Sequence, residues 1–230
     1  MLGIRCTSHG AASFFTKGFF LLEKYYDGWD EALIHNISFI MNQAIVDEFV
    51  ENVHMDVMTP QYARAAVAGG IPVNARDTYG YTALQWAVYN NNRELVEVLL
   101  SVGADANAED RRHWTSVWYG AVGGTADILQ LLLHAGGRVD NTGTDSLLIT
   151  MVRCAKDLEC VSRDAIPRLR VLLACPELNL DVKHDGQSAE EWALKKGYRK
   201  VAAVIAHEQK RRARWTRLRA AWVAGIINPA

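Results

Sequence analysis

The feature that most constrains the fold is an internal repeat with a period of thirty-three residues. The segment that begins at Asp77 (DTYGYTALQWAV) aligns without a gap with the segment that begins at Asp110 (DRRHWTSVWYGA). The alignment continues through the apolar stretch ELVEVLL at Glu94 and its counterpart DILQLLL at Asp127. Repeats of this length form solenoids, because each short unit can bury its apolar face only by stacking against its neighbours.

The residues of one unit predict two helices separated by a turn. We expect the first helix to begin after Thr82, because this side chain can cap the first turn and Gln85 can complete a capping box. The three asparagines at 90–92 predict a turn, and the apolar residues at 95–100 predict a second helix. Gly103 is a typical helix terminator. A polar segment then leads into the next unit.

These residues resemble the ankyrin repeat, whose unit has a DxxGxTPLHxAA helix, a short turn, a second helix ending in LL and a GADVNA-like finger. The resemblance is strongest over 77–141, and a similar unit occurs at 186–206, where Ser188 and Glu191 predict another capping box. One departure is His113, which stands where the family has a left-handed glycine; histidine tolerates that conformation. The resemblance implies an all-α, ankyrin-type helical solenoid of about four repeats.

The sequence predicts three segments along the chain. Residues 1–58 form an N-terminal arm and a capping helix, because the apolar stripe over 30–53 is too wide for a free surface helix. Residues 59–206 form the repeat domain, beginning with a partial repeat at 59–76. A degenerate unit at 145–172 contains about ten extra residues within 153–165, which we expect to form an ordered loop or a helix extension. Residues 207–230 form a basic, amphipathic C-terminal helix, so that helical caps lie at both ends.

Several functional classes find no support in the sequence. No apolar run approaches the roughly 20 residues of a membrane-spanning helix. Neither a P-loop nor a GxSxG motif occurs. The spacing of Cys154, Cys160, Cys175 and His184 matches no familiar zinc site. We therefore expect no enzyme activity, no cofactor, no metal and no small-molecule substrate.

The cysteines and the first residues bear on the compartment. Four unevenly spaced cysteines do not make a disulfide framework, which favours an intracellular, reducing compartment and hence the cytoplasm. Residues 1–22 contain Arg5 and Lys17, four phenylalanines and no acidic residue. This composition is typical of a mitochondrial targeting segment, although an ordinary apolar N-terminal arm has the same composition.

The family resemblance also points to a recognition surface. Ankyrin-like stacks bind through a concave face formed by fingers and first helices, and its variable positions are rich in Tyr, Trp and Arg here. These residue types predominate at interface hot spots. The predicted partner-binding residues are Tyr79, Tyr81, Tyr89, Arg111, Arg112 and Trp114. The alternative is that Tyr81 and Trp114 only brace neighbouring fingers. At equivalent positions inside the first helices, Trp86, Tyr119 and Trp192 are expected to be core residues.

The two ends of the chain carry opposite charge. Residues 23–63 contain eight acidic residues and one lysine, whereas 195–219 contain ten Lys or Arg and one glutamate. From Val201 the helical pattern continues to Gly225, with Trp215, Leu218, Trp222 and Ile226 on one stripe. This helix is either a cap, a ligand for a protein groove, or a contact for an anionic membrane surface or nucleic acid, with Arg214, Trp215 and Trp222 as its binding residues.

Together these patterns predict a non-enzymatic protein-protein interaction module, or a structural subunit of a larger assembly, that binds through its concave finger and inner-helix face. The expected partner is a protein, in a stable multi-subunit complex or outside one. The alternative function is a nucleic-acid-associated or membrane-surface-associated protein that acts through the basic C-terminal helix.

Overall fold

The computed structural model describes residues 31–139, 146–154 and 165–223, without the side chains of 31–42 and of Cys154. The chain divides into two compact units, the first ending at Arg111 and the second beginning at Arg112. Almost all of the regular structure in the described part is helical, which confirms the predicted all-α class. No helix in these ranges is both long and apolar enough to cross a membrane.

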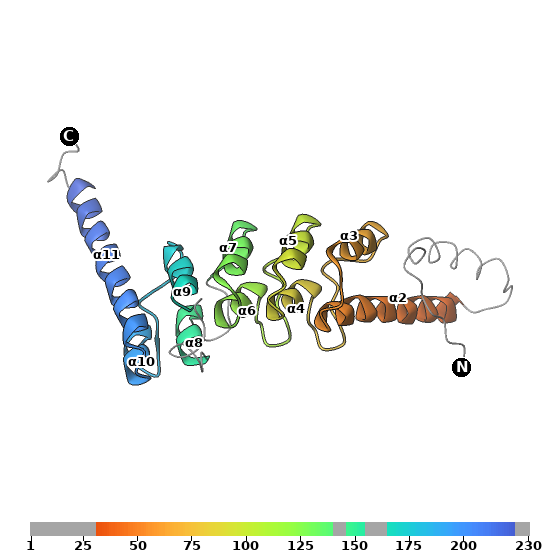
Figure 1. Ribbon diagram of the computed structural model, residues 1–230, viewed down its shortest axis with the longest axis horizontal. Helices are drawn as coiled ribbons and strands as arrows, with labels where there is room; N and C mark the ends of the chain where they lie inside the picture. The colour runs from red at the N-terminus through yellow and green to blue at the C-terminus, as the bar shows by residue number, and fades with distance from the viewer. Residues whose placement is uncertain (1–30, 140–145, 155–164, 224–230) are drawn as a thin grey trace. The chain divides into compact units, whose positions relative to one another are not determined.

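The first unit contains two layers of helices (Figure 1). Its helices are α2 (Glu31–His54), α3 (Pro60–Ala68), α4 (Ala83–Tyr89) and α5 (Arg93–Ser101). The first helices of successive pairs, α2 and α4, pack against each other, and the second helices α3 and α5 do the same. We call these the first-helix layer and the second-helix layer.

The second unit repeats this two-layer arrangement (Figure 1). Its helices are α6 (Ser116–Val122), α7 (Ala126–His134), α8 (Leu147–Cys154), α9 (Ala165–Ala174), α10 (Ala189–Lys195) and α11 (Arg199–Val223). Helices α6, α8 and α10 pack in order as the first-helix layer, and α7, α9 and α11 as the second-helix layer. A short antiparallel pair, β1 (Lys183–His184) and β2 (Gln187–Ser188), joins Lys183 to Ser188 and His184 to Gln187 in the finger before α10.

Local sequence determines where the helices begin. The capping box predicted at Thr82 and Gln85 is confirmed: the Gln85 amide donates to Thr82 Oγ1 over 3.3 Å and the Thr82 amide donates to Gln85 Oε1 over 2.8 Å. The box at Ser188 and Glu191 is confirmed in the same way. Thr115 caps α6 by accepting from the amide of Trp118. These caps satisfy amides that the first turn of a helix leaves unpaired.

The left-handed turn predicted at His113 is also present. Gly80 has φ +93°, and His113, thirty-three residues later, has φ +62°. An added Cβ at Gly80 would lie 2.7 Å from Cγ of Arg111, so this glycine also allows that side chain to pack over the finger. The second finger thus keeps the left-handed conformation with a histidine.

Equivalent apolar residues form the core of each unit. Leu95 and Leu99 on α5 are fully buried, and so are their counterparts Ile128 and Leu132 on α7. Helix α8 is different because buried side chains surround it, including Leu147, Leu148, Ile149, Met151 and Val152. A short helix that is apolar all round belongs between neighbours on both sides, and α8 packs against α6 and α10.

Two expectations concern the ends of the chain. The last turns of α2 bury Phe49, Val50 and Val53 and pack against α4, so α2 occupies the first-helix layer, and α3, which follows it in the chain, lies in the second-helix layer. The described helices therefore form five successive pairs where the sequence predicted about four units.

The predicted helix from Val201 is present as α11, which runs unbroken from Arg199 to Val223. The predicted targeting segment at 1–22 and most of the insertion, 155–164, lie outside the described residues.

Candidate functional site

The predicted binding residues fall in both compact units, and each unit is considered by itself. Tyr79, Tyr81, Tyr89 and Arg111 belong to the first unit, whereas Arg112 and Trp114 belong to the second. Arg214, Trp215 and Trp222 lie on α11 in the second unit.

In the first unit, Asp77 organises the finger that precedes α4. Its Oδ1 accepts hydrogen bonds from the backbone amides of Tyr79, over 2.9 Å, and Tyr81, over 2.8 Å. Its Oδ2 accepts one from Nε1 of Trp86 over 3.0 Å. One carboxylate therefore fixes both the finger backbone and an indole on the adjoining helix, since hydrogen bonds to a charged acceptor are the stronger kind.

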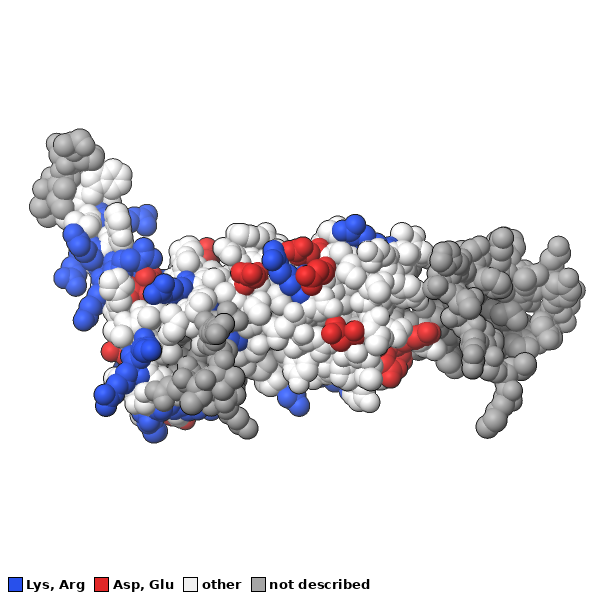
Figure 2. Space-filling view, viewed as in Figure 1, with Lys and Arg blue, Asp and Glu red and all other residues white. Residues whose placement is uncertain are grey.

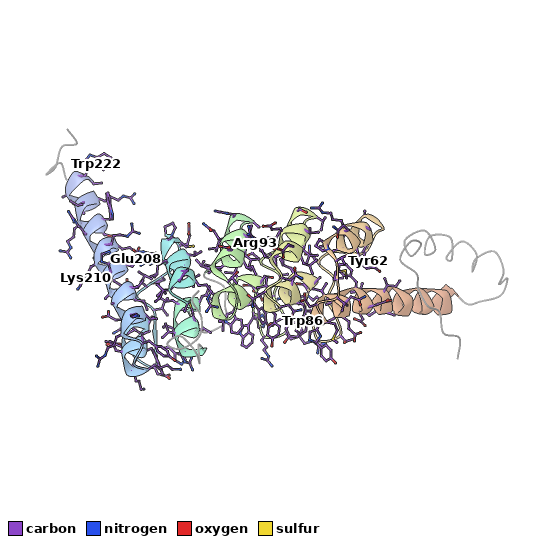
Figure 3. All side chains as sticks on the ribbon, viewed as in Figure 1. Tyr62, Trp86, Arg93, Glu208, Lys210 and Trp222 are labelled. Atoms are coloured by element: carbon purple, nitrogen blue, oxygen red, sulfur yellow. The ribbon has the colours of Figure 1, made fainter. Side chains whose placement is uncertain are left out.

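An aromatic cluster surrounds Trp86 on the first-helix layer (Figure 3). The ring of His54 stacks on Trp86 with centroids 3.8 Å apart, Tyr81 contacts it at 4.7 Å, and Tyr89 meets it edge-on at 5.7 Å. Tyr79 and Tyr89 are 70% and 62% exposed, whereas Tyr81 is half-buried. The cluster thus offers the exposed phenol of Tyr89 next to a fixed aromatic base, and Tyr79 adds a second exposed phenol on the finger held by Asp77.

Arg111, in the finger that follows along the chain, supports the finger of Asp77. Its guanidinium donates to the backbone carbonyl of Thr78, and its aliphatic stem covers Gly80. The structure therefore ties this predicted binding residue to the finger backbone, although it remains exposed.

A second aromatic cluster lies in the second unit at the start of α6. The rings of Trp114 and Trp118 stack with centroids 3.8 Å apart and planes within 9°. The guanidinium of Arg112 lies 5.0 Å over Trp114, and Tyr119 meets both indoles edge-on. Because Trp118 is buried at 7% exposure, it provides the base on which half-buried Trp114 rests. One face of the Trp114 ring therefore packs against Trp118, as expected if Trp114 braces the finger. Arg112 covers part of the ring.

The first helix of the last pair, α10, carries a third cluster of the same kind. Trp192 donates from Nε1 to the carbonyl of His184 over 3.2 Å. Two cations lie over its ring: Nζ of Lys195 at 4.7 Å from the centroid and the guanidinium of Arg153 at 5.5 Å. Cations over an indole face are attracted by its quadrupole.

The expectation that Trp86, Tyr119 and Trp192 are core residues is wrong. All three are half-buried, and each belongs to a surface cluster. The periodicity that places a residue on the first helix does not distinguish an inter-repeat position from one beside the finger. The sequence did contain a signal that these indoles lie beside the finger, which is a hydrogen-bond partner shortly before each of them. Asp77 precedes Trp86, and His184 precedes Trp192, by less than ten residues.

The inner half of α11 packs firmly onto α9. Val201, Ala202 and Ile205 are buried, and Arg212 donates to the carbonyls of Leu173, Cys175 and Leu178, over 2.8, 2.8 and 2.6 Å. The guanidinium of Arg212 thus closes the C-terminal end of α9.

Glu208 holds this arrangement in place. Its carboxylate accepts from Arg211 over 2.7 Å at two atoms and from Arg212 over 3.0 Å. The hydrogen bonds from Arg211 are the largest cause that lowers the pKa of Glu208, and those from Arg212 add to them against the opposing effect of burial. The same ion pair raises the pKa of Arg211.

Beyond Arg212 the helix α11 is exposed. Trp215 and Trp222 are 64% and 57% exposed, and Leu218 is also exposed. Basic side chains gather over this part of the second unit (Figure 2). The interpretation in which a cap folds its tryptophans back onto the stack is therefore wrong for these described residues, although the inner half of α11 does cover α9.

The described residues contain no group of three or more His, Cys, Asp or Glu side chains that could hold a metal ion. A groove of about 500 Å³ lies between α9 and α11, lined by Arg170, Leu173, Ala174, Ala203, Val204, His207, Glu208 and Arg211. The carboxylate of Glu208 in this groove already forms ion pairs with Arg211 and Arg212. Burial, the largest cause, and the nearby Glu177 raise the pKa of the neighbouring Cys175 thiol, so this thiol is not activated as a nucleophile.

Comparison with known families identifies the repeated unit. A family described as ankyrin repeats, in three copies, matches residues 42–145. The match begins inside α2, in agreement with the place of that helix in the first-helix layer. Ankyrin repeats are generally protein-protein interaction modules and typically lack enzyme activity.

Similar proteins share only the repeats. The ankyrin repeat domain-containing protein SAT10 of Stachybotrys chartarum is 39% identical over 94 residues, which is 40% of this chain and 5% of that protein. The E3 ubiquitin-protein ligase KEG of Arabidopsis thaliana is 29% identical over 131 residues, which is 55% of this chain and 8% of the ligase. The Notch-regulated ankyrin repeat-containing protein A of Danio rerio is 38% identical over 61 residues, which is 26% of this chain and 54% of that protein.

Proposed function

We propose that this chain, which is an ankyrin repeat protein, binds a protein partner without catalysis and that each unit contributes the aromatic residues of its fingers and first helices to binding. The proposal concerns Tyr79, Tyr81, Tyr89 and Arg111 in the first unit and Arg112 and Trp114 in the second. The chain acts as an interaction module or as a structural subunit of a protein complex.

The observation that carries the proposal is the recurrence of one arrangement on three first helices. Each of α4, α6 and α10 bears an aromatic cluster, with Trp86, Trp118 and Trp192 as the indoles of those helices. In two of the clusters a cation covers an indole: Arg112 covers Trp114, and Lys195 covers Trp192. Apart from Trp118, which is buried, the aromatic residues of these clusters lie outside the core, and aliphatic residues make up most of the core.

The chemistry of these clusters suits a protein surface. Tyr and Trp provide large contact areas at a small cost in side-chain entropy, because rings have few rotatable bonds, and Arg is also enriched at interface hot spots. Stacking and the Asp77 hydrogen bonds hold the rings before a partner arrives, which reduces the entropy lost on binding. Tyr79 on the finger and Tyr89 in the first cluster are the most exposed aromatic side chains of the proposed surface in the first unit.

The proposal is tested on a partner isolated by affinity purification with the tagged chain. Tyr79→Ala with Tyr89→Ala, and separately Trp114→Ala, should each weaken binding by ~2 kcal/mol, or about thirtyfold in Kd. The matched control is Tyr62→Ala, because Tyr62 is an exposed tyrosine on α3 in the second-helix layer (Figure 3).

The tyrosine pair gives the cleaner result. Both residues are exposed, so their removal should leave the urea midpoint of unfolding unchanged, whereas Trp114→Ala removes a ring from a stack and can lower it. Unchanged affinity for both the tyrosine pair and Trp114→Ala, with a loss for Tyr62→Ala, would place the interface on the second-helix layer and end the proposal.

A further inference from the structure

The outer half of α11 carries several cations that form no ion pair within the described part of the chain. Lys210, Arg214, Arg217 and Arg219 make no ion pair with any described residue, in contrast to Arg211 and Arg212, which share Glu208. The same half exposes Trp215, Leu218 and Trp222. We call these seven residues the basic helix end.

Two faces of the basic helix end lie side by side. Trp215, Leu218 and Trp222 follow one another at spacings of three and four, and so share one face of the helix. Lys210, Arg214 and Arg217 share another face, about 100° away around the helix axis. An apolar row beside a row of cations is the pattern of a helix that lies in an apolar groove with an acidic edge.

The first unit exposes a surface with the complementary chemistry. Glu48, Glu51 and Met55 are exposed and follow at spacings of three and four at the end of α2, where red side chains appear in Figure 2. Met55 and Val57 are 64% and 66% exposed, and Asp56 lies between them. Neither Glu48 nor Glu51 has an ion pair in the described part of the chain. We call these five residues the acidic patch.

We propose that the acidic patch of one copy of this chain receives the basic helix end of a second copy. Charge complementarity supports this occupant, because each surface combines unpaired charge of one sign with exposed apolar side chains. Association pairs Arg214 and Arg217 with glutamates and removes Trp215 and Met55 from water together. Because the two surfaces differ, the contact is head-to-tail, and an open oligomer keeps one free acidic patch at one end and one free basic helix end at the other.

Other anionic occupants fit these observations less well. A membrane-surface helix needs a wide apolar face, whereas the large exposed apolar residues in the described part of α11, which are Trp215, Leu218, Trp222 and Val223, form a narrow strip with arginines on both sides. A nucleic acid duplex would use the cations and leave Leu218 and Trp222 exposed. Neither occupant involves the acidic patch.

Complementation between two variants tests the proposal. The helix variant carries Arg214→Ser, Arg217→Ser and Trp215→Ser, and the patch variant carries Glu48→Gln and Glu51→Gln, so that the two altered surfaces do not attract each other. All of these residues are exposed, so both variants should keep the wild-type circular dichroism spectrum and melting temperature. A control with Glu94→Gln and Glu97→Gln makes the same charge change on α5, away from the patch.

Sedimentation velocity over a concentration series gives the readout. The wild type and the control should form dimers and larger species, with an association that weakens about tenfold or more when salt is raised from low to high ionic strength. Each variant alone should be monomeric. An equimolar mixture should form a one-to-one dimer and nothing larger, because only one intact pair of surfaces remains.

Three results would overturn the proposal. These are a wild type that stays monomeric, variants that associate as well as the wild type, or a mixture that stays monomeric. Adding vesicles of phosphatidylserine and phosphatidylcholine, or a single-stranded RNA, to the monomeric patch variant covers the other occupants. Binding of either that the helix variant lacks, without self-association of the wild type, would assign the basic helix end to that ligand.

Discussion

Replacing Arg212 with methionine tests whether α11 is attached to α9 by the guanidinium rather than by apolar packing alone. Methionine keeps most of the aliphatic length and removes five N–H donors. Three backbone carbonyls then lose their donor, those of Leu173, Cys175 and Leu178. Glu208 keeps its hydrogen bonds from Arg211, so no carboxylate is left unpaired.

The size of the effect follows from the burial of these groups. A hydrogen bond to a charged group contributes ~1.5–3 kcal/mol when buried. The side chain of Arg212 is 26% exposed, and water can reach part of the vacated carbonyls, so the three bonds do not add in full. We expect a loss of about 2–3 kcal/mol in the free energy of unfolding.

The matched control is Arg211→Met, one residue away on the same helix. The side chain of Arg211 is 53% exposed and its hydrogen bonds go to Glu208 alone, which would keep Arg212. Urea unfolding followed by circular dichroism should show a clear destabilisation for Arg212→Met and a small one for Arg211→Met. Hydrogen exchange should increase in peptides of α9 and α11 in the first variant. Equal effects of the two variants would refute the reasoning.

Three further predictions concern stability. Gly137→Ala should destabilise by ~2 kcal/mol in urea unfolding, because its Cβ would lie 2.5 Å from Cγ2 of Val117 and 2.7 Å from the carbonyl oxygen of Leu132, whereas Gly123→Ala, with its nearest atom at 3.8 Å, should change little. Asp77→Ala should speed amide exchange at Tyr79 and Tyr81, with a loss of about 2 kcal/mol, and exchange at wild-type rates would contradict the role of that carboxylate. Because the pKa of Glu208 is held below its ordinary value of 4.5, its stabilisation is complete above that pH and is lost as pH falls through the lowered pKa. The stability difference between the wild type and Glu208→Gln should therefore shrink below about pH 4.5, and a difference that stays constant to pH 2 would show that the ion pair is not its source.

Much of the fold could be predicted from local signals in the sequence. Thr82 with Gln85 and Ser188 with Glu191 are short-range patterns, so the helix starts are determined within four residues of chain. His113 was predictable because Gly80 occupies the same place in the preceding unit. The pairing of helices followed from the period alone.

What could not be predicted depends on long-range contacts. The carbonyls that accept from Arg212 lie 34 to 39 residues earlier in the chain, and no local pattern distinguishes this arginine from Arg211. The half-buried state of Trp86 depends on His54, which stacks on it from the end of α2. The place of α2 in the first-helix layer was hidden because it lacks the finger motif that marks the later repeats.

Hydroxyl-radical footprinting of the chain with and without its captured partner tests the proposed function most directly. The measurement is made at a concentration where the chain itself is monomeric, and it reads the oxidation of individual aromatic side chains by mass spectrometry. Partner binding should protect Tyr79, Tyr89 and Trp114 and leave Tyr62 on α3 unchanged. Protection of Tyr62 or Trp215, with Tyr79, Tyr89 and Trp114 oxidised as in the free chain, would contradict recognition through the first-helix layer.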